Sequence, residues 1–476
     1  MKHIVTTIVF ALPLMTACSP TVQEAKLLSE EAPIFPDYKG VTLPCNIAPV
    51  RFGLADSCVV EKAIAVFTSG KQEVVIASNG HSFDISQKQW HELAAASSEI
   101  SVRVQIRQQD QWLEYEPFKF IISPDSIDSH LAYRLIEPGY EYWNEMGIYQ
   151  RDLESYDEKS IINNRQTDEG CINCHSFPQN NPDKMLFHLR KKFSGTYLVR
   201  DGETVKLPTG KGDIPPTLVY PYWHPSGRYI AFSTNQTKQV FHASDRNRIE
   251  VFDFSSDILV YDIVNEKAIK STVTAGEGHF ETFPSFSPDG KTLYFCTADS
   301  LKMPDGYEQL RYSLCSTSFD AETGTLGTSV DTLFNANLEE KSVSFPRVSP
   351  DGQRLVFTRA SYGTFSIWHR DADLYELNLN TGQIKPLESI NSDEVESYHS
   401  WSSNGRWMVF SSRRMDGLYT RPFITHVDQD GNYSKPFPVP QKDANFYQRL
   451  MKSYNIPEFI KGPVTAESTM ILSVIK

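Results

Sequence analysis

The chain has 476 residues, with 46 Lys and Arg against 59 Asp and Glu, and a formal net charge of −13. Hydrophobic residues make up 40% of it and aromatic residues 12%, which excludes a largely disordered chain because such chains bury too little apolar surface. An acidic balance without a basic cluster makes nucleic acid a poor partner, since phosphate contacts need concentrated Lys and Arg. The length predicts about two to four domains.

The N-terminus is typical of an export signal. In residues 1–17 a charged Lys2 precedes an apolar stretch, and small residues lead into Cys18. The Leu-Met-Thr-Ala-Cys sequence resembles a bacterial lipoprotein signal, which implies acylation of Cys18; an ordinary secretory signal with a coincidental cysteine is the alternative. We expect a tether over 18–40 and a lipid anchor that holds the protein to a membrane of the bacterial cell envelope, the outer membrane being favoured.

Two regions follow the tether. Residues 41–125 contain alternating segments such as Ile100–Arg107, and this period of two is typical of half-buried strands. They predict a β-sandwich-like domain with Trp90 in its core. Residues 126–185 change character, and we interpret them as a short, mainly helical segment broken at 138–139.

The C-terminal region, 186–476, carries an internal repeat, and a repeat of this length indicates a propeller or a solenoid. Each copy joins a turn of the Ser-Pro-Asp-Gly type to an alternating strand. The four clear copies are YWHPSGRYIAFS (222–233), FSPDGKTLYFCT (286–297), VSPDGQRLVFTR (348–359) and WSSNGRWMVFSS (401–412). They resemble the WD-like repeats of the TolB C-terminal domain. The resemblance implies a β-propeller of five or six blades, whose loops bind a partner protein or a ligand, in a mainly β protein.

The sharpest local motif is Cys171-Ile172-Asn173-Cys174-His175. In C-x-x-C-H, two thiols attach a haem and the next histidine binds the iron. The export signal agrees with this interpretation, because c-type haem is attached outside the cytoplasm. We therefore predict one covalent haem c per chain, held by Cys171, Cys174 and His175. A disulfide or redox pair and a zinc site are the alternatives.

The second iron ligand is less clear from the sequence. Met185 is the favoured distal ligand and His188 the alternative, since both follow the motif closely. The competing interpretation makes Met185 a core residue and His188 a strand residue bonded to backbone. A five-coordinate iron with an open face is a further possibility.

Arg413, Arg414 and Asp416 lie on one loop of the last clear blade. Paired arginines suit an anionic ligand, because each guanidinium donates two parallel hydrogen bonds. The alternative, favoured here, is a structural ion pair with Asp416. No G-x-S-x-G, H-E-x-x-H or glycine-rich phosphate loop occurs, so the sequence offers no motif for a hydrolase.

Four further cysteines are even in number and suit two disulfides. Cys45 and Cys58 are close in the sequence, and Cys296 and Cys315 are expected on neighbouring strands of one blade. Free buried thiols are the alternative for the second pair.

The sequence as a whole predicts an exported, lipid-anchored monohaem protein for electron transfer or haem-linked redox chemistry, with the propeller as a docking surface for a protein partner. The alternative is a non-enzymatic envelope protein whose propeller recognises a protein or a glycan. A haem-assisted oxidoreductase is a third hypothesis, and whether the protein is an enzyme stays open.

Overall fold

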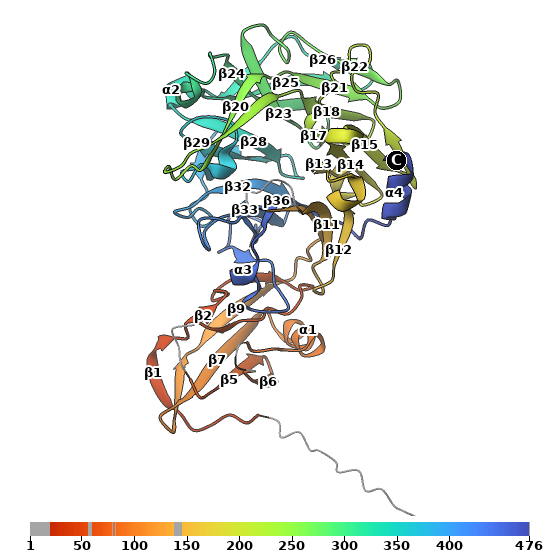
Figure 1. Ribbon diagram of the computed structural model, residues 1–476. Helices are drawn as coiled ribbons and strands as arrows, with labels where there is room; N and C mark the ends of the chain where they lie inside the picture. Colours follow the sequence, from red (N-terminus) through yellow and green to blue (C-terminus); the bar gives the residue numbers. More distant parts are fainter. Residues whose placement is uncertain (1–19, 56–59, 79, 81, 138–144, 476) are drawn as a thin grey trace, which may run out of the picture.

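The computed structural model describes residues 20–55, 60–78, 80, 82–137 and 145–475. A six-bladed β-propeller forms the upper body in Figure 1, and a smaller N-terminal domain lies below it. The predicted mainly β fold with a propeller is therefore confirmed, and the blade number is six. Cys18 and the signal sequence lie outside the described residues.

The N-terminal domain is built on one seven-stranded sheet. Its main path runs β1-β8-β7-β5-β6, with β9 beside β7 and β3 beside β9, and the separate pair β2-β4 lies nearby. The strands are β1 (Lys26–Glu31), β2 (Ile34–Phe35), β3 (Thr42–Pro44), β4 (Gly53–Leu54), β5 (Lys62–Ser69), β6 (Gln72–Ala77), β7 (Glu99–Gln108), β8 (Gln111–Glu116) and β9 (Phe118–Ser123). Because β1 pairs in parallel with β8, part of the segment predicted as a tether belongs to this sheet.

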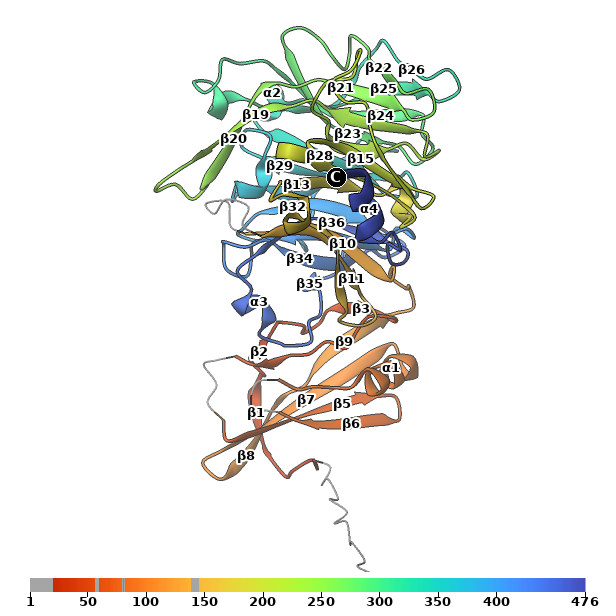
Figure 2. The ribbon, with the colours of Figure 1, turned by 45° about the vertical axis from the view of Figure 1, so that its right-hand side comes forward.

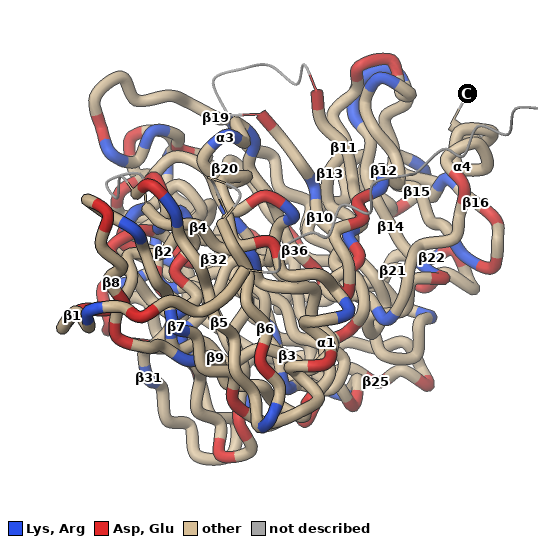
Figure 3. Tube along the Cα trace, turned by 90° about the horizontal axis from the view of Figure 1, so that it is seen from below, with Lys and Arg blue, Asp and Glu red and all other residues tan. Residues whose placement is uncertain are grey.

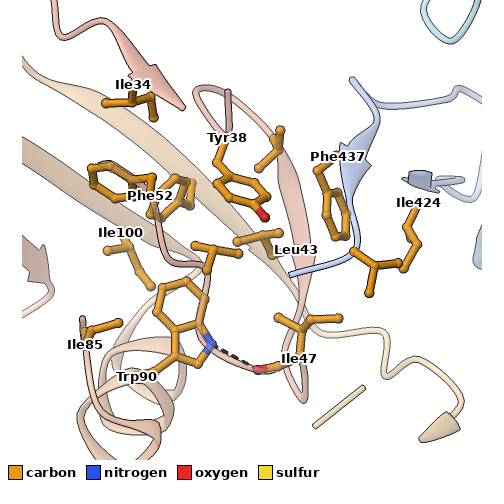
Figure 4. Packing of buried hydrophobic residues seen from close by; sticks show 14 of the residues in the cluster. Ile34, Tyr38, Leu43, Ile47, Phe52, Ile85, Trp90, Ile100, Ile424 and Phe437 are labelled. Atoms are coloured by element: carbon orange, nitrogen blue, oxygen red, sulfur yellow. Dashed lines mark hydrogen bonds between the residues drawn. The ribbon is translucent and has the colours of Figure 1, made fainter. Parts of the chain in front are cut away.

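One helix, α1 (Gln87–Ala96), packs on this sheet. Ser86 caps its first turn together with Gln89, and Trp90 and Leu93 face the core. The Trp90 indole donates a hydrogen bond of 3.0 Å to the carbonyl of Ile47 (Figure 4). A buried tryptophan N–H needs such a partner, so this bond fixes the ring in the core.

The two bodies share one hydrophobic core. Figure 4 shows Ile424 and Phe437 of the propeller beside Tyr38 and Leu43 of the N-terminal domain. All four side chains are fully or almost fully buried. A continuous apolar contact of this kind holds two domains in a fixed orientation.

Five blades of the propeller are four-stranded sheets, and blade 3 has a fifth strand. Blades 1 and 2 contain β13 (Ile172–Ser176), β14 (Lys184–Leu189), β15 (Gly195–Arg200), β16 (Glu203–Lys206), and then β17 (Val219–Trp223), β18 (Tyr229–Ser233), β21 (Ile258–Asp262) and β22 (Lys267–Ile269). A separate hairpin, β19 (Gln236–Phe241) with β20 (Ile249–Ser255), is inserted after β18.

Blades 3 to 5 follow in chain order and each begins with its innermost strand. They contain β23 (His279–Phe286), β24 (Thr292–Asp299), β25 (Ser313–Asp320), β26 (Thr325–Leu326) and β27 (Asp331–Phe334); β28 (Ser342–Val348), β29 (Arg354–Ala360), β30 (Asp373–Asn378) and β31 (Ile384–Pro386); and β32 (Glu396–Trp401), β33 (Trp407–Ser412), β34 (Arg421–His426) and β35 (Phe437–Pro438). The short helices are α2 (Ala336–Glu339), α3 (Phe446–Arg449) and α4 (Ser468–Ile475), and α3 lies between the propeller and the N-terminal domain, where Tyr447 joins the shared core (Figure 1).

Blade 6 joins two distant parts of the chain. Its innermost strand, β36 (Ser453–Ile460), pairs with β10 (His130–Ile136), followed by β11 (Met146–Asp152) and β12 (Glu158–Asn163). Figure 2 shows blue β36 beside orange β10. The ring is therefore closed by a strand from the C-terminal part of the chain, and each blade keeps only a short outer edge strand.

The prediction of a helical segment over 126–185 is wrong. The described part of that segment supplies the outer strands of blade 6, the first strand of blade 1 and the start of β14, and its helical structure is limited to two 3₁₀ turns, Asn164–Thr167 and Pro178–Asn180. The propeller consequently starts at His130 rather than at residue 186. The apolar residues of the segment alternate along paired strands and pack between blades, so tertiary pairing decides their structure.

The repeated turns explain why the blades form where the sequence places them. In blade 3 the Ser287 hydroxyl donates to Asp289 and accepts from the Thr292 amide, while Gly290 takes a left-handed φ of 74° that glycine tolerates. The same bonds recur at Ser349 with Asp351 and Arg354, and at Ser402 with Asn404 and Trp407. Each turn joins an innermost strand to its neighbour.

None of the described cysteines is paired. Cys45 donates to the Pro124 carbonyl, and Cys58 lies outside the described residues. Cys315 lies opposite Phe295 in the strand register, so Cys296 points to the other face of the sheet. The suggested cross-strand disulfide is therefore absent, and both thiols are buried in separate clusters.

We expect Phe459→Ala in β36 to destabilise the protein by about 3–5 kcal/mol, because Phe459 is fully buried where blade 6 meets the shared core. Met451→Ala, two residues before the same strand, is the control, since Met451 is 68% exposed. Urea unfolding followed by circular dichroism measures both. Equal midpoints for the two variants would contradict the role of β36 in closing the ring.

Candidate ligand-binding cavity

Every innermost strand contains one residue in the left-handed backbone region. At this residue the register against the second strand shifts, which is the signature of a β-bulge. The six residues, with φ between 48° and 55°, are Cys174, Tyr220, Phe283, Phe345, Tyr398 and Ile456. We call them the bulge ring.

The side chains of the bulge ring meet in the centre of the propeller. Tyr220 and Phe283 lie 4.5 Å apart between ring centroids, Phe283 and Phe345 4.1 Å, and Phe345 and Tyr398 4.7 Å. Ile456 packs against the same cluster. These aromatic contacts fill the central channel of the propeller and form the closed end of a cavity.

The central cavity has a volume of about 420 Å³ and opens at the carboxyl ends of the innermost strands. Its floor includes Cys174, Tyr220, Phe345 and Ile456 of the bulge ring. Its walls are aromatic and polar, formed by Tyr222, Trp223, Phe286, Trp401, Gln179, Asn180, Arg347, Ser400, Glu458 and Lys461.

The residue at one equivalent position of the innermost strands lines the cavity in five of the six blades. The residue two positions after each bulge residue is, from blade 1 to blade 6, Ser176, Tyr222, Ser285, Arg347, Ser400 and Glu458. All of these except Ser285 line the cavity. Arg347 and Glu458 were not predicted as site residues from the sequence. An alignment of the six bulges shows that both lie two positions after a bulge residue.

Indole hydrogen bonds between blades hold the wall in place. Trp223 of blade 2 donates to the Ser176 carbonyl of blade 1 at 3.3 Å, and Trp401 of blade 5 donates to the Arg347 carbonyl of blade 4 at 3.3 Å. Asn180 donates to the carbonyls of Trp401 and Phe459. The cavity is therefore preformed rather than assembled from loops.

Arg347 and Glu458 face the cavity from blades 4 and 6. Arg347 donates to the Pro346 carbonyl and lies 4.9 Å over the Tyr222 ring, but it forms no ion pair with a described carboxylate. Burial lowers its pKa, against the influence of Tyr222 and Glu458. Burial raises the pKa of Glu458 to about 8, although the Phe177 amide donates to its carboxyl at 3.0 Å. Glu458 is thus largely protonated at neutral pH.

Two histidines line the same cavity and are neutral. Burial lowers the pKa of His175 and of His399 to about 3 each. His399 contacts the Val356 carbonyl through Nε2 at 2.8 Å, whereas neither ring nitrogen of His175 has a hydrogen-bond partner among the described residues. A neutral His175 therefore offers one donor and one acceptor to a bound molecule.

The predicted haem c is wrong, and the strand geometry gives the reason. The C-x-x-C-H residues run from the end of a loop into β13, and Cys174 is the bulge residue of blade 1, equivalent to Tyr220 and Phe283 in the next blades. Only Cys174 and His175 line the cavity, while Cys171 lies buried outside it. Haem attachment requires both thiols to face one group, which this strand does not provide.

The predicted distal iron ligands lie elsewhere. Met185 is fully buried in the hydrophobic cluster between blades 6 and 1, as a core residue. His188, on the same strand β14, contacts the Thr196 hydroxyl at 3.1 Å, and burial lowers its pKa to about 4. Among the described residues, no group of three or more His, Cys, Asp or Glu side chains is placed to hold a metal ion.

The two adjacent arginines of the last clear blade, Arg413 and Arg414, have different surroundings. Arg414 forms an ion pair of 2.9 Å with the buried Glu396, so its role is structural. Asp416 pairs with Arg421 at 3.7 Å rather than with its neighbour. Arg413 forms an ion pair with neither Glu396 nor Asp416.

The comparisons with known proteins give a short sequence match. No protein-family model matches the chain. A stretch of 174 residues is 25% identical to dipeptidyl-peptidase 5 of Porphyromonas gingivalis, which covers 37% of this chain and 21% of that enzyme. The chain thus spans about a fifth of the length of this curated relative.

Several solved structures match the chain at low similarity. An oligogalacturonate lyase in complex with manganese is 11% identical with a TM-score of 0.37, covering 66% of this chain and 75% of that one. A puromycin-hydrolysing peptidase of Mycobacterium tuberculosis is 12% identical with a TM-score of 0.35, covering 88% and 57%. At these values the structural likenesses carry no argument about function.

The predicted electron-transfer function is wrong as well. The relative found by sequence is a dipeptidyl-peptidase and not a cytochrome. Together with the position of Cys174 in a blade bulge, this removes the observation on which the redox hypothesis rested.

A Ser-His-Asp grouping occurs near the N-terminal domain, but its geometry differs from a catalytic triad. Ser123 and Asp125 contact the same nitrogen, Nε2 of His426, at 3.1 and 2.9 Å. In a triad the acid and the nucleophile bind opposite nitrogens of the imidazole. This grouping therefore joins blade 5 to the end of β9 and is structural.

The raised pKa of Glu458 predicts a pH-dependent stability. Because the folded pKa of about 8 exceeds the unfolded value of 4.5, unfolding releases a proton between these values and the folded state loses stability as the pH rises from 5 to 8. The loss is at most about 1.4 kcal/mol per pH unit and is smaller for a group that contacts solvent. Glu458→Gln should remove it.

The measurement is the free energy of urea unfolding of both proteins at pH 5 and pH 8. Other carboxyls with raised pKa values, such as Glu281 and Asp253, are present in both proteins and cancel in the difference. A wild-type minus variant difference that stays constant with pH would contradict the burial of Glu458 as a neutral acid.

Proposed function

We propose that the protein is an exported, lipid-anchored propeller that binds a peptide segment in the central cavity. The observation that carries the proposal is the pair Arg347 and Glu458, which face one cavity from two blades without an ion pair between them. The peptidase relative agrees with a peptide ligand. The repeats support a propeller of the TolB-like kind as the scaffold.

The cavity suits the mixed chemistry of a peptide. Arg347 and a protonated Glu458 both donate hydrogen bonds, and these match peptide carbonyls. Neutral His175 and the Asn180 side chain lie on the same walls. Peptide side chains would pack on the aromatic residues Tyr222 and Trp401, which resemble the anchors of peptide-binding sites elsewhere.

The anchor completes the proposal. Cys18 would carry the lipid, and this places the soluble body at the membrane of a bacterial envelope. Among the described residues, none of the helices is both long and apolar enough to cross a membrane. Acidic and basic residues are interspersed on the face seen from the N-terminal domain (Figure 3), so this face offers no single-sign field to a partner.

An array of random octapeptides, each with a free or an acetylated amino terminus, tests the proposal. Peptides that bind the wild type are resynthesised with fluorescein, and their dissociation constants are measured by fluorescence polarisation. We expect Arg347→Gln to weaken binding about tenfold or more, the size of one charge-assisted hydrogen bond. Arg200→Gln, outside the cavity on β15, should leave binding unchanged.

The proposal fails if no peptide binds the wild type, or if Arg347→Gln and Arg200→Gln bind equally well. Binding of an oligosaccharide array in the absence of peptide binding would also overturn it. Circular dichroism and the melting temperature of Arg347→Gln establish that the variant is folded before binding is compared.

Peptide binding should also weaken above pH 8. Glu458 then loses the proton through which it donates, whereas Glu458→Gln keeps an amide donor at every pH. The ratio of dissociation constants at pH 9 and pH 6 should therefore be larger for the wild type than for the variant. Equal ratios would show that Glu458 does not donate to the ligand.

A further inference from the structure

A second hollow lies at the amino-terminal ends of the innermost strands, on the opposite face from the central cavity. Its volume is about 350 Å³. We call it the arginine hollow, because four of its lining residues are arginines. They come from the β19–β20 hairpin, the segment after β29 and the loop after β33, and are Arg246, Arg248, Arg370 and Arg413.

Arg413 is a buried cation that forms no ion pair with a described carboxylate. Its residue is 5% exposed, its guanidinium lies 3.5 Å over the Trp368 ring, and no described residue accepts a hydrogen bond from it. Burial lowers its pKa to about 9, which leaves it charged at neutral pH. A charge removed from water without a partner is costly, so such a side chain is normally paired or binds a ligand.

Three carboxylates, Asp245, Glu394 and Asp416, also line the hollow. Asp245 is exposed and accepts a hydrogen bond from the Asn247 amide, and the other two pair with arginines other than Arg413. Asp416 pairs with Arg421 at 3.7 Å, and Glu394 pairs with Arg370 at 3.0 Å. The buried Glu396 is held by Arg414. Each of these three arginines, Arg370, Arg414 and Arg421, has a carboxylate partner, whereas Arg413 has none.

A second cation adds to the same hollow. Arg248 is exposed, forms no ion pair with a described carboxylate, and lowers the pKa of Arg413 by repulsion. Two arginines that repel one another across a hollow attract an anion, because its charge offsets both.

We propose that the arginine hollow binds an oxyanion, the carboxylate or phosphate group of a small ligand. Arg413 donates two parallel hydrogen bonds to the oxyanion, and Arg248 supplies a second donor from the rim. The Trp368 ring holds the Arg413 guanidinium in place from its other side, which orients the donors before the ligand arrives. The site is separate from the central cavity and independent of peptide binding.

Isothermal titration calorimetry with two probes, sodium phosphate and sodium succinate, tests this site at constant ionic strength set with sodium chloride. We expect the wild type to bind one or both, which distinguishes the phosphate from the carboxylate source. Arg413→Met and Arg248→Gln should each weaken binding at least tenfold. Arg449→Gln is the control, since this exposed arginine of α3 pairs with Asp443 outside the hollow.

Absence of binding by the wild type to both probes would overturn the proposal. So would equal affinities in the wild type and in Arg248→Gln together with Arg413→Met. Because Arg248 is exposed, its substitution leaves the packing of the blade intact and keeps the test valid even where Arg413→Met unfolds. Peptide binding by these variants should stay at the wild-type level, which separates this site from the central cavity.

Discussion

The left-handed residue in each innermost strand is the constraint on which the channel depends. A side chain in this conformation costs about 1–2 kcal/mol per residue, and the innermost strands contain it six times. The contacts of 4.1–4.7 Å between the aromatic members offset that cost, and they also fill the axis. The bulge then turns the residue two positions later toward the mouth. The residues at this one position of the repeat therefore supply Arg347 and Glu458, the two ionisable side chains on which the proposed peptide binding depends.

The same constraint explains why a strong motif was misleading. Cys174 and His175 stand where other blades have an aromatic residue followed by proline, as at Phe345 and Pro346. Tyr398 and His399 repeat the pattern with a histidine. Taken alone, the five residues of the C-x-x-C-H motif indicate haem attachment. In the context of the repeat, they include the β-bulge of blade 1, and Cys174 is a member of the bulge ring.

The sequence predicts the blades whose turns are local. The Ser-Pro-Asp-Gly type of turn forms within a few residues, and each of the four copies joins two strands of one blade. Blade 6 could not be predicted in this way, because β36 pairs with β10 more than half the chain away. The convergence of Arg347 and Glu458 depends on that closure, so the cavity was hidden from a local analysis.

The two faces of the propeller differ in charge while sharing one structural element. At the mouth, Arg347 and the protonated Glu458 both offer hydrogen-bond donors to one cavity, whereas on the other face Arg413 and Arg248 bring positive charge without an ion-pair partner to the hollow. The bulge ring lies between them. Its member Tyr398 contacts Phe345 of the cavity floor, and burial raises the pKa of Tyr398, which the charges of Arg134 and Arg413 offset only in part. The packed aromatic contacts of the ring separate the two sites, so each is expected to bind its ligand independently of the other.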